Sequence, residues 1–152
     1  MNADEMSLGG ERPLVIRKLV LYHLVAGMTC LVIALIGGFL YSLLFLQKYP
    51  AEGIEFLSPG RVRMVHTNLI AFGFLVNSFV GLLYWAIPRM SRRPVLNEQL
   101  GWLIFWVWQT IMLATLVGIL LGEAQALEWG ETPVWVDPFV VVGAVLLMAQ
   151  FY

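Results

Sequence analysis

The sequence has few charged side chains, and those that it has are unevenly placed. Asp, Glu, Lys and Arg make up 12% of the 152 residues, about half of what a soluble domain carries. None occurs between Lys18 and Lys48, between Arg63 and Arg89, or between Glu98 and Glu123. Each run is long enough for a helix across a hydrocarbon core of about 30 Å. The low charge therefore argues against a soluble domain and predicts an integral membrane protein.

Cysteine and histidine are also scarce. Cys30 is the only cysteine, which excludes a disulfide framework and a cysteine metal cluster within the chain. We interpret it as a small residue that faces lipid or another helix. The chain has no basic run typical of nucleic-acid binding. His23 and His66 are the only two imidazoles that could serve as metal ligands.

Four apolar runs predict an all-α fold, a polytopic transmembrane helix bundle. We expect helices at about 19–45, 64–87 and 100–121, with Pro88 and the arginines after it ending the second. The fourth run, 138–152, has 15 residues. That length corresponds to about 22 Å of helix, which is too short to span the bilayer. The sequence thus predicts one unit, 1–152, with three complete helices and a truncated fourth.

Basic residues predict the orientation of the chain in the membrane. Six lie on the side of the N-terminus and three on the other. The first set is Arg12, Arg17, Lys18, Arg89, Arg92 and Arg93, and the second is Lys48, Arg61 and Arg63. Because cytoplasmic loops carry the excess of Lys and Arg, we expect a cytoplasmic N-terminus.

His66 is the strongest candidate for a ligand-binding residue. It is expected in the first turn of the second helix, just inside the outer interface, and neutral imidazole is a common ligand of heme iron. On a regular helix, His66, Gly73, Asn77 and Tyr84 fall within about 20° of one line. Gly73 would let a flat macrocycle approach the backbone. The alternative is a hydrogen-bonded histidine, with Gly73 and Asn77 serving helix packing.

Two arginines and two glutamates are expected at the same outer surface. The guanidinium groups of Arg61 and Arg63 could bind heme propionates, or could be ordinary interfacial anchors. Carboxylates of Glu128 and Glu131 beside propionates would need a hard cation such as calcium. Their alternative is a solvated acidic loop.

His23 is not expected to share an iron with His66. It lies near the cytoplasmic end of the first helix, and roughly 20 Å of membrane would separate the two imidazoles. We interpret His23 as a polar residue near the inner interface. A second ligand for an iron at His66 would have to come from another chain or from sequence beyond residue 152.

The segment GRVRMVHTNLIAFGFLVN, residues 60–77, resembles the second transmembrane helix of heme–copper oxidase subunit I. It is most similar to the cbb(3)-type cytochrome c oxidases and the related nitric oxide reductases. The resemblance implies that His66 is an axial ligand of low-spin heme b and that Arg63 contacts its propionates. EWGE, residues 128–131, resembles a family motif that implies a calcium ligand at Glu128, with Glu131 as a weaker candidate.

The family fold has roughly twelve helices, so the resemblance covers only its N-terminal part. The high-spin heme, the copper and all catalytic residues are implied to lie beyond residue 152. The implied partners are the remainder of subunit I, membrane-anchored cytochrome c subunits and the lipid of a bacterial cytoplasmic membrane. The whole enzyme would pass electrons from cytochrome c to dioxygen and form water. The alternatives are a nitric oxide reductase, a non-enzymatic membrane fragment, and a b-type cytochrome whose heme is shared by two copies of His66.

Overall fold

The computed structural model describes residues 13–151, which form helices and loops with no strand among them. α1 spans Arg17–Ser42 and continues as the 3-10 helix η2, Leu43–Leu46. After the short η3, Glu55–Leu57, one continuous helical stretch is made of α2 (Pro59–Asn68), η4 (Leu69–Val76) and α3 (Asn77–Ser91). α4 spans Glu98–Leu121, and α5 spans Asp137–Phe151. Arg12 and Tyr152 lie outside the described residues.

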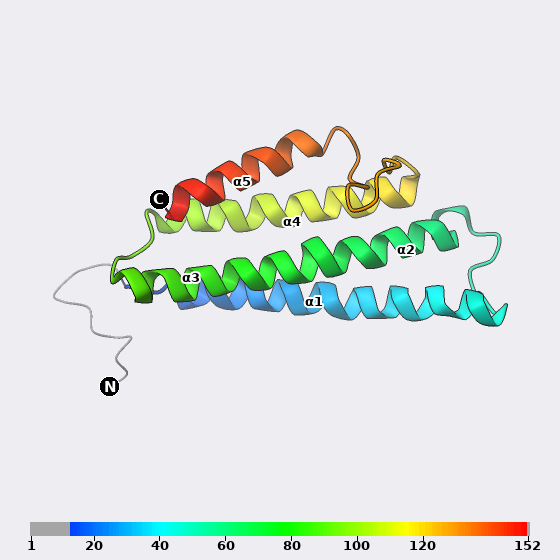
Figure 1. Cartoon of the computed structure of the whole chain (residues 1–152), viewed down its shortest axis with the longest axis horizontal. Helices are drawn as coiled ribbons and strands as arrows, with labels where there is room; N and C mark the ends of the chain where they lie inside the picture. The colour runs from blue at the N-terminus through cyan, green and yellow to red at the C-terminus, as the bar shows by residue number, and fades with distance from the viewer. Residues whose placement is uncertain (1–12, 152) are drawn as a thin grey trace.

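The helices lie side by side with nearly common axes, as Figure 1 shows. α1 packs along α2, η4 and α3, while α4 packs against α5 on one side and α2 on the other. The end of α3, the beginning of α4 and the end of α5 share one end of the bundle with the beginning of α1 (Figure 1). The loop after α1 and the loop between α4 and α5 lie at the opposite end.

Three helical stretches are long and apolar enough to cross a membrane by length and composition: Arg17–Leu46, Pro59–Ser91 and Glu98–Leu121. The predicted helical membrane bundle with three long helices and one shorter apolar helix is therefore confirmed. Many large apolar side chains on these helices are exposed. Such a surface suits a hydrocarbon environment, because the exposure of apolar side chains to water is unfavourable.

Local chemistry explains where α4 begins and ends. The side-chain oxygen of Asn97 accepts a hydrogen bond from the backbone N–H of Gln99 at 2.8 Å, which caps the first turn. At the other end, Gly122 has φ 90°, and the N–H of Glu123 returns to the carbonyl of Gly118 at 2.9 Å. This glycine-based ending satisfies carbonyls that would otherwise have no partner in an apolar environment.

Two expectations for the second long helix were wrong. The helix begins at Pro59, so His66 lies in its second turn rather than its first. Pro88 does not end it, and the predicted end is right only for the arginines that follow, because α3 continues to Ser91 and stops where Arg92 takes a φ of 53°. Proline removes one backbone donor, but here it lies within one turn of the end, where a single lost bond does not interrupt the helix.

The segment η4 is a π-helix of eight residues between two α-helical segments. Its i→i+5 hydrogen bonds make wider turns than those of a regular helix. The expected alignment of His66 with Asn77 along one line of the helix assumed regular α-helical turns throughout. The sequence pattern therefore did not predict η4. This segment determines how His66 is rotated relative to α3.

Candidate functional site

His66 is half-buried and points from α2 towards α1. Its Nδ1 lies 2.7 Å from the carbonyl oxygen of Ala34. A carbonyl oxygen can only accept, so Nδ1 carries the proton and donates it. The neutral ring then has an unprotonated Nε2 with a free lone pair. Metal-binding histidines are commonly oriented in this way, with the second ring nitrogen donating to a backbone carbonyl.

Two glycines of α1 face His66, and one of them, Gly38, makes this contact possible. A Cβ built on Gly38 would lie 2.5 Å from Cε1 and 2.7 Å from Nδ1 of His66, closer than real Cβ contacts. A Cβ on Gly37 would lie 3.8 Å from the Cβ of His66. The imidazole therefore occupies space that only a bare backbone at position 38 leaves open. Sequence reasoning missed these residues, although two adjacent glycines in an apolar helix are a usable signal of close packing.

Gly73 and Asn77 are in contact with protein. A Cβ on Gly73 would lie 2.8 Å from the Cβ of Cys30, so this glycine admits a neighbouring helix. Asn77 is fully buried; its amide nitrogen donates to the carbonyl of Gly73, and its amide oxygen meets His23 and Gln109. Gly73 and Asn77 therefore make the contacts between helices that the packing alternative describes, and their heme-facing role stays a prediction.

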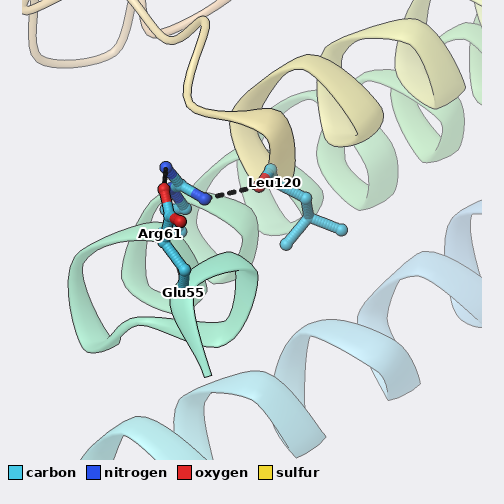
Figure 2. Close-up of polar contacts among 3 residues, drawn as sticks. All are labelled: Glu55, Arg61 and Leu120. Carbon is cyan, nitrogen blue, oxygen red and sulfur yellow. Dashed lines mark hydrogen bonds and ion pairs between the residues drawn. The ribbon is translucent and has the colours of Figure 1, made fainter. Parts of the chain in front are cut away.

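Arg61 connects three segments, as Figure 2 shows. Its Nη1 donates to the carbonyl of Leu120 in the last turn of α4 at 2.8 Å. Its Nη2 pairs with Glu55 of η3 at 3.1 Å, and the arginine side chain is only 19% exposed. A guanidinium that neutralises carbonyls at a helix C-terminus is favourable. In this structure, Arg61 therefore holds the loop before α2 against the end of α4.

Arg63 differs from Arg61 in having a free guanidinium. It is half-buried in α2, one turn before His66. Within residues 13–151, no hydrogen bond or ion pair of its guanidinium is present. Of the two arginines expected at propionates, Arg63 is the one available to an additional anion.

Gly122 leaves the space that the Arg61 guanidinium fills. A Cβ there would lie 2.6 Å from Nη2 of Arg61, and the residue has φ 90°. Gly53 offers a matched control, because it has φ 83° but nothing within 4 Å of its Cβ position. We expect Gly53→Ala to cost about 1 to 2 kcal/mol through its backbone alone and Gly122→Ala to cost clearly more. Thermal unfolding of the two variants in the complete subunit measures the difference; equal transition temperatures would contradict the arginine contact.

Glu128 and Glu131 have different surroundings. Glu128 is exposed, whereas Glu131 is 4% exposed and accepts a hydrogen bond from Nδ2 of Asn68 at 2.8 Å. That amide nitrogen also donates to the carbonyl of Met64, which fixes its orientation and leaves the buried Oδ1 of Asn68 without a donor. In the described part of the chain, no three His, Cys, Asp or Glu residues gather as a metal site. Any calcium at this end would need further ligands.

His23 is buried within the bundle, two turns from the beginning of α1. Its side chain is 1% exposed and lies between Asn77, Tyr84 and Phe105. His66 meets α1 at Ala34, which is 11 residues beyond His23 and therefore about 16 Å further along the helix. The two imidazoles lie at different levels of the bundle, in agreement with the expectation that they do not share an iron.

Comparison with known proteins places this arrangement in a family. The family model described as cytochrome c and quinol oxidase polypeptide I matches residues 18–152. Cytochrome c oxidase subunit 1 of Rhodobacter capsulatus is 32% identical over 123 residues, which cover 76% of this chain and 23% of the relative.

Two relatives come from Stutzerimonas stutzeri, one an oxidase subunit and one a nitric oxide reductase subunit. The Cbb3-type cytochrome c oxidase subunit CcoN1 is 24% identical over 99 residues, covering 65% of this chain and 21% of the relative. A subunit of nitric oxide reductase is 33% identical over 97 residues, covering 62% and 20%. The chain thus spans less than a quarter of the length of these relatives. The resemblance to heme–copper oxidase subunit I is confirmed, and the chain belongs to the cytochrome c and quinol oxidase polypeptide I family.

Proposed function

We propose that this chain is the N-terminal part of the catalytic subunit of a respiratory terminal oxidase and that His66 is an axial ligand of its low-spin heme b. The observation that carries the proposal is the 2.7 Å contact between Nδ1 of His66 and the carbonyl of Ala34. In the neutral imidazole, this contact leaves the lone pair of Nε2 available, and that lone pair is what binds iron. Membership of a heme-containing oxidase family supports the same role.

Three groups of this chain would fit such a heme directly: the imidazole of His66, the carbonyl of Ala34 and the guanidinium of Arg63. His66 would supply the lone pair, and the Ala34 carbonyl would hold the ring in its tautomer and raise its basicity. The free guanidinium of Arg63 would neutralise a propionate. A bound heme would supply one-electron transfer, while Arg61 would act indirectly by fixing the first turn of α2 against α4.

The activity of the whole enzyme would depend on residues outside this chain. We propose electron transfer from membrane-anchored cytochrome c subunits, through this heme, to a heme–copper site that reduces dioxygen to water. The catalytic residues, high-spin heme and copper would belong to the remaining part of subunit I. The relatives named cytochrome c oxidase, including the Cbb3-type subunit, support this assignment.

Nitric oxide reduction is the second candidate, because one relative carries that name at 33% identity. The experiment that separates the two is metal analysis of the purified complete subunit together with its reduced-minus-oxidised spectrum. Copper together with b-type heme would support the oxidase. Non-heme iron in place of copper would support the reductase, and a spectrum without b-type heme would refute both.

Glu128 remains the proposed calcium ligand, because it is exposed while Glu131 is bonded to Asn68. We expect a calcium chelator to lower the thermal stability of the complete enzyme and to have no such effect on Glu128→Gln. Glu131→Gln is the control, since its amide oxygen can still accept from Asn68 and calcium dependence should persist. Chelation that lowers the stability of wild type and Glu128→Gln equally would contradict the assignment.

We also propose a bacterial cytoplasmic membrane location with a cytoplasmic N-terminus. The beginning of α1, which carries Arg17 and Lys18, and the end of α3, where Arg89 and Arg92 lie, share one end of the bundle (Figure 1). A concentration of basic residues at one end is what the positive-inside rule expects of the cytoplasmic face. A reporter that works only in the cytoplasm should be active when it is fused to the N-terminus. Activity of a fused reporter that works only on the outer side would instead show the opposite orientation.

A further inference from the structure

A buried polar cluster joins three long helical stretches at Asn77, away from His66. The amide nitrogen of Asn77 donates to the carbonyl of Gly73 at 2.7 Å. Because that carbonyl can only accept, the orientation of the Asn77 amide is determined. Its Oδ1 therefore faces the other two partners, His23 at 3.1 Å and Gln109 at 2.8 Å.

The cluster also fixes the tautomer of His23. Oδ1 of Asn77 can only accept, so Nδ1 of His23 must carry the proton and donate it. Gln109 supplies the second donor through Nε2. Asn77 thus accepts one bond from α1 and one from α4, and donates one within its own helical stretch. Each of these groups is buried or half-buried, where leaving a polar atom unpaired costs about 1 to 3 kcal/mol.

Asn77 lies at the junction between η4 and α3. It is the first residue of α3, directly after the wide turns of η4. Where i→i+5 bonding changes to i→i+4 bonding, a carbonyl at the junction loses its regular backbone donor. The side chain of Asn77 donates to the carbonyl of Gly73, which lies within η4. A side-chain donor at this point would replace a missing backbone N–H and so favour the wide turns over a regular helix.

The wide turns determine where His66 points. His66 lies three residues before η4, and each extra residue taken up by a wide turn rotates the preceding segment by about 100° relative to a regular helix. The observed rotation brings the imidazole to the Ala34 carbonyl while α3 keeps its contacts with His23. Loss of η4 would therefore turn His66 away from Ala34.

We propose that Asn77, held by His23 and Gln109, is a positioning residue that maintains η4 and so sets the orientation of His66 towards its ligand. This inference rests on the proposed heme ligation by His66. In that setting, the bond to Ala34 makes the imidazole a stronger donor and favours ferric heme. Releasing the bond should raise the midpoint potential of the low-spin heme.

The test uses the complete enzyme in its native membrane and compares four substitutions. Asn77→Ala and His23→Ala should both raise the midpoint potential of the low-spin heme and shift its electron paramagnetic resonance signals. His23→Asn should behave as wild type, because an asparagine amide nitrogen occupies nearly the place of Nδ1 and can donate. Thr115→Val is the matched control: Thr115 is a buried residue outside the cluster, and its hydroxyl has no partner in the described residues.

A second measurement does not depend on heme. Cys30 lies against Gly73 in η4, so a change in the turns of η4 should alter its reaction with a membrane-permeant maleimide. The rate is followed by mass spectrometry of the peptide that contains Cys30. We expect faster labelling in Asn77→Ala and His23→Ala, and unchanged labelling in His23→Asn and Thr115→Val. Gln109→Met removes only the bond from Gln109 to Asn77. It takes the place of Asn77→Ala in both measurements if that variant does not accumulate in the membrane.

The two proposals fail in different ways. Wild-type potential and wild-type labelling in Asn77→Ala, His23→Ala and Gln109→Met would overturn the role of Asn77. Altered labelling with an unchanged potential would also overturn it, since η4 would then change without affecting His66. A low-spin signal that survives His66→Ala would instead refute the heme ligation itself.

Discussion

Replacing His66 by alanine is expected to abolish the low-spin heme signal of the complete enzyme. The imidazole is the only proposed iron ligand in this chain, and alanine offers no lone pair in its place. Without one of its axial ligands, a six-coordinate heme no longer stays low-spin or is released from the protein. The loss of the low-spin signal should therefore be nearly complete. Reduced-minus-oxidised optical spectra and low-temperature electron paramagnetic resonance on membranes of equal subunit content measure it.

His23→Asn is the appropriate control for this experiment. It removes the other imidazole of the chain while retaining the donor to Asn77, so the low-spin signal should remain. A spectrum that His66→Ala leaves unchanged would exclude His66 as the ligand. Loss of the signal in both variants, at normal protein levels, would show that the spectrum does not depend on His66 specifically.

Gly38→Ala is expected to have the second-largest effect. The added Cβ would lie 2.5 Å from Cε1 of His66, and the atom that must move is the ring of a side chain rather than backbone. The helices can therefore keep their places while the imidazole is displaced and loses its bond to Ala34. We expect the low-spin heme content to fall severalfold, and the remaining heme to show a raised midpoint potential.

Gly60→Ala provides the matched comparison for Gly38→Ala. Both glycines are helical and lack a positive φ, but a Cβ on Gly60 would have nothing within 4 Å. Gly60→Ala should therefore keep wild-type heme content and potential. If the two variants gave the same heme content and the same potential, the contact between His66 and Gly38 would have no part in ligand positioning.

Much of the fold was predictable because lipid imposes a simple requirement. A segment without charge cannot leave its backbone groups unpaired in hydrocarbon, so each of the three uncharged runs must be a helix. The observed spans agree with the expected ones to within about five residues. The largest deviations occur at Pro59 and Ser91, where polar residues extend the second helix beyond the uncharged run.

The candidate site was only partly predictable. His66 and the two arginines were identified from residue type and position, but the partners of Arg61 could not be. Leu120 is 59 residues away and contributes a backbone carbonyl, which no side-chain pattern reveals. In the same way, Glu131 meets Asn68 across 63 residues. These contacts depend on which helices are neighbours, and periodicity within one helix does not contain that information.

By itself, the sequence determined the membrane class and the number of long helices, and it singled out His66 as the candidate iron ligand. Hydropathy and ligand chemistry are local properties, so they can be read from residues in order. Only the tertiary structure decided that Gly73 and Asn77 face α1, that Gly38 makes room for His66, and that η4 rotates it towards Ala34. Those outcomes follow from steric fit and hydrogen-bond satisfaction between helices, which exist only once the helices have packed.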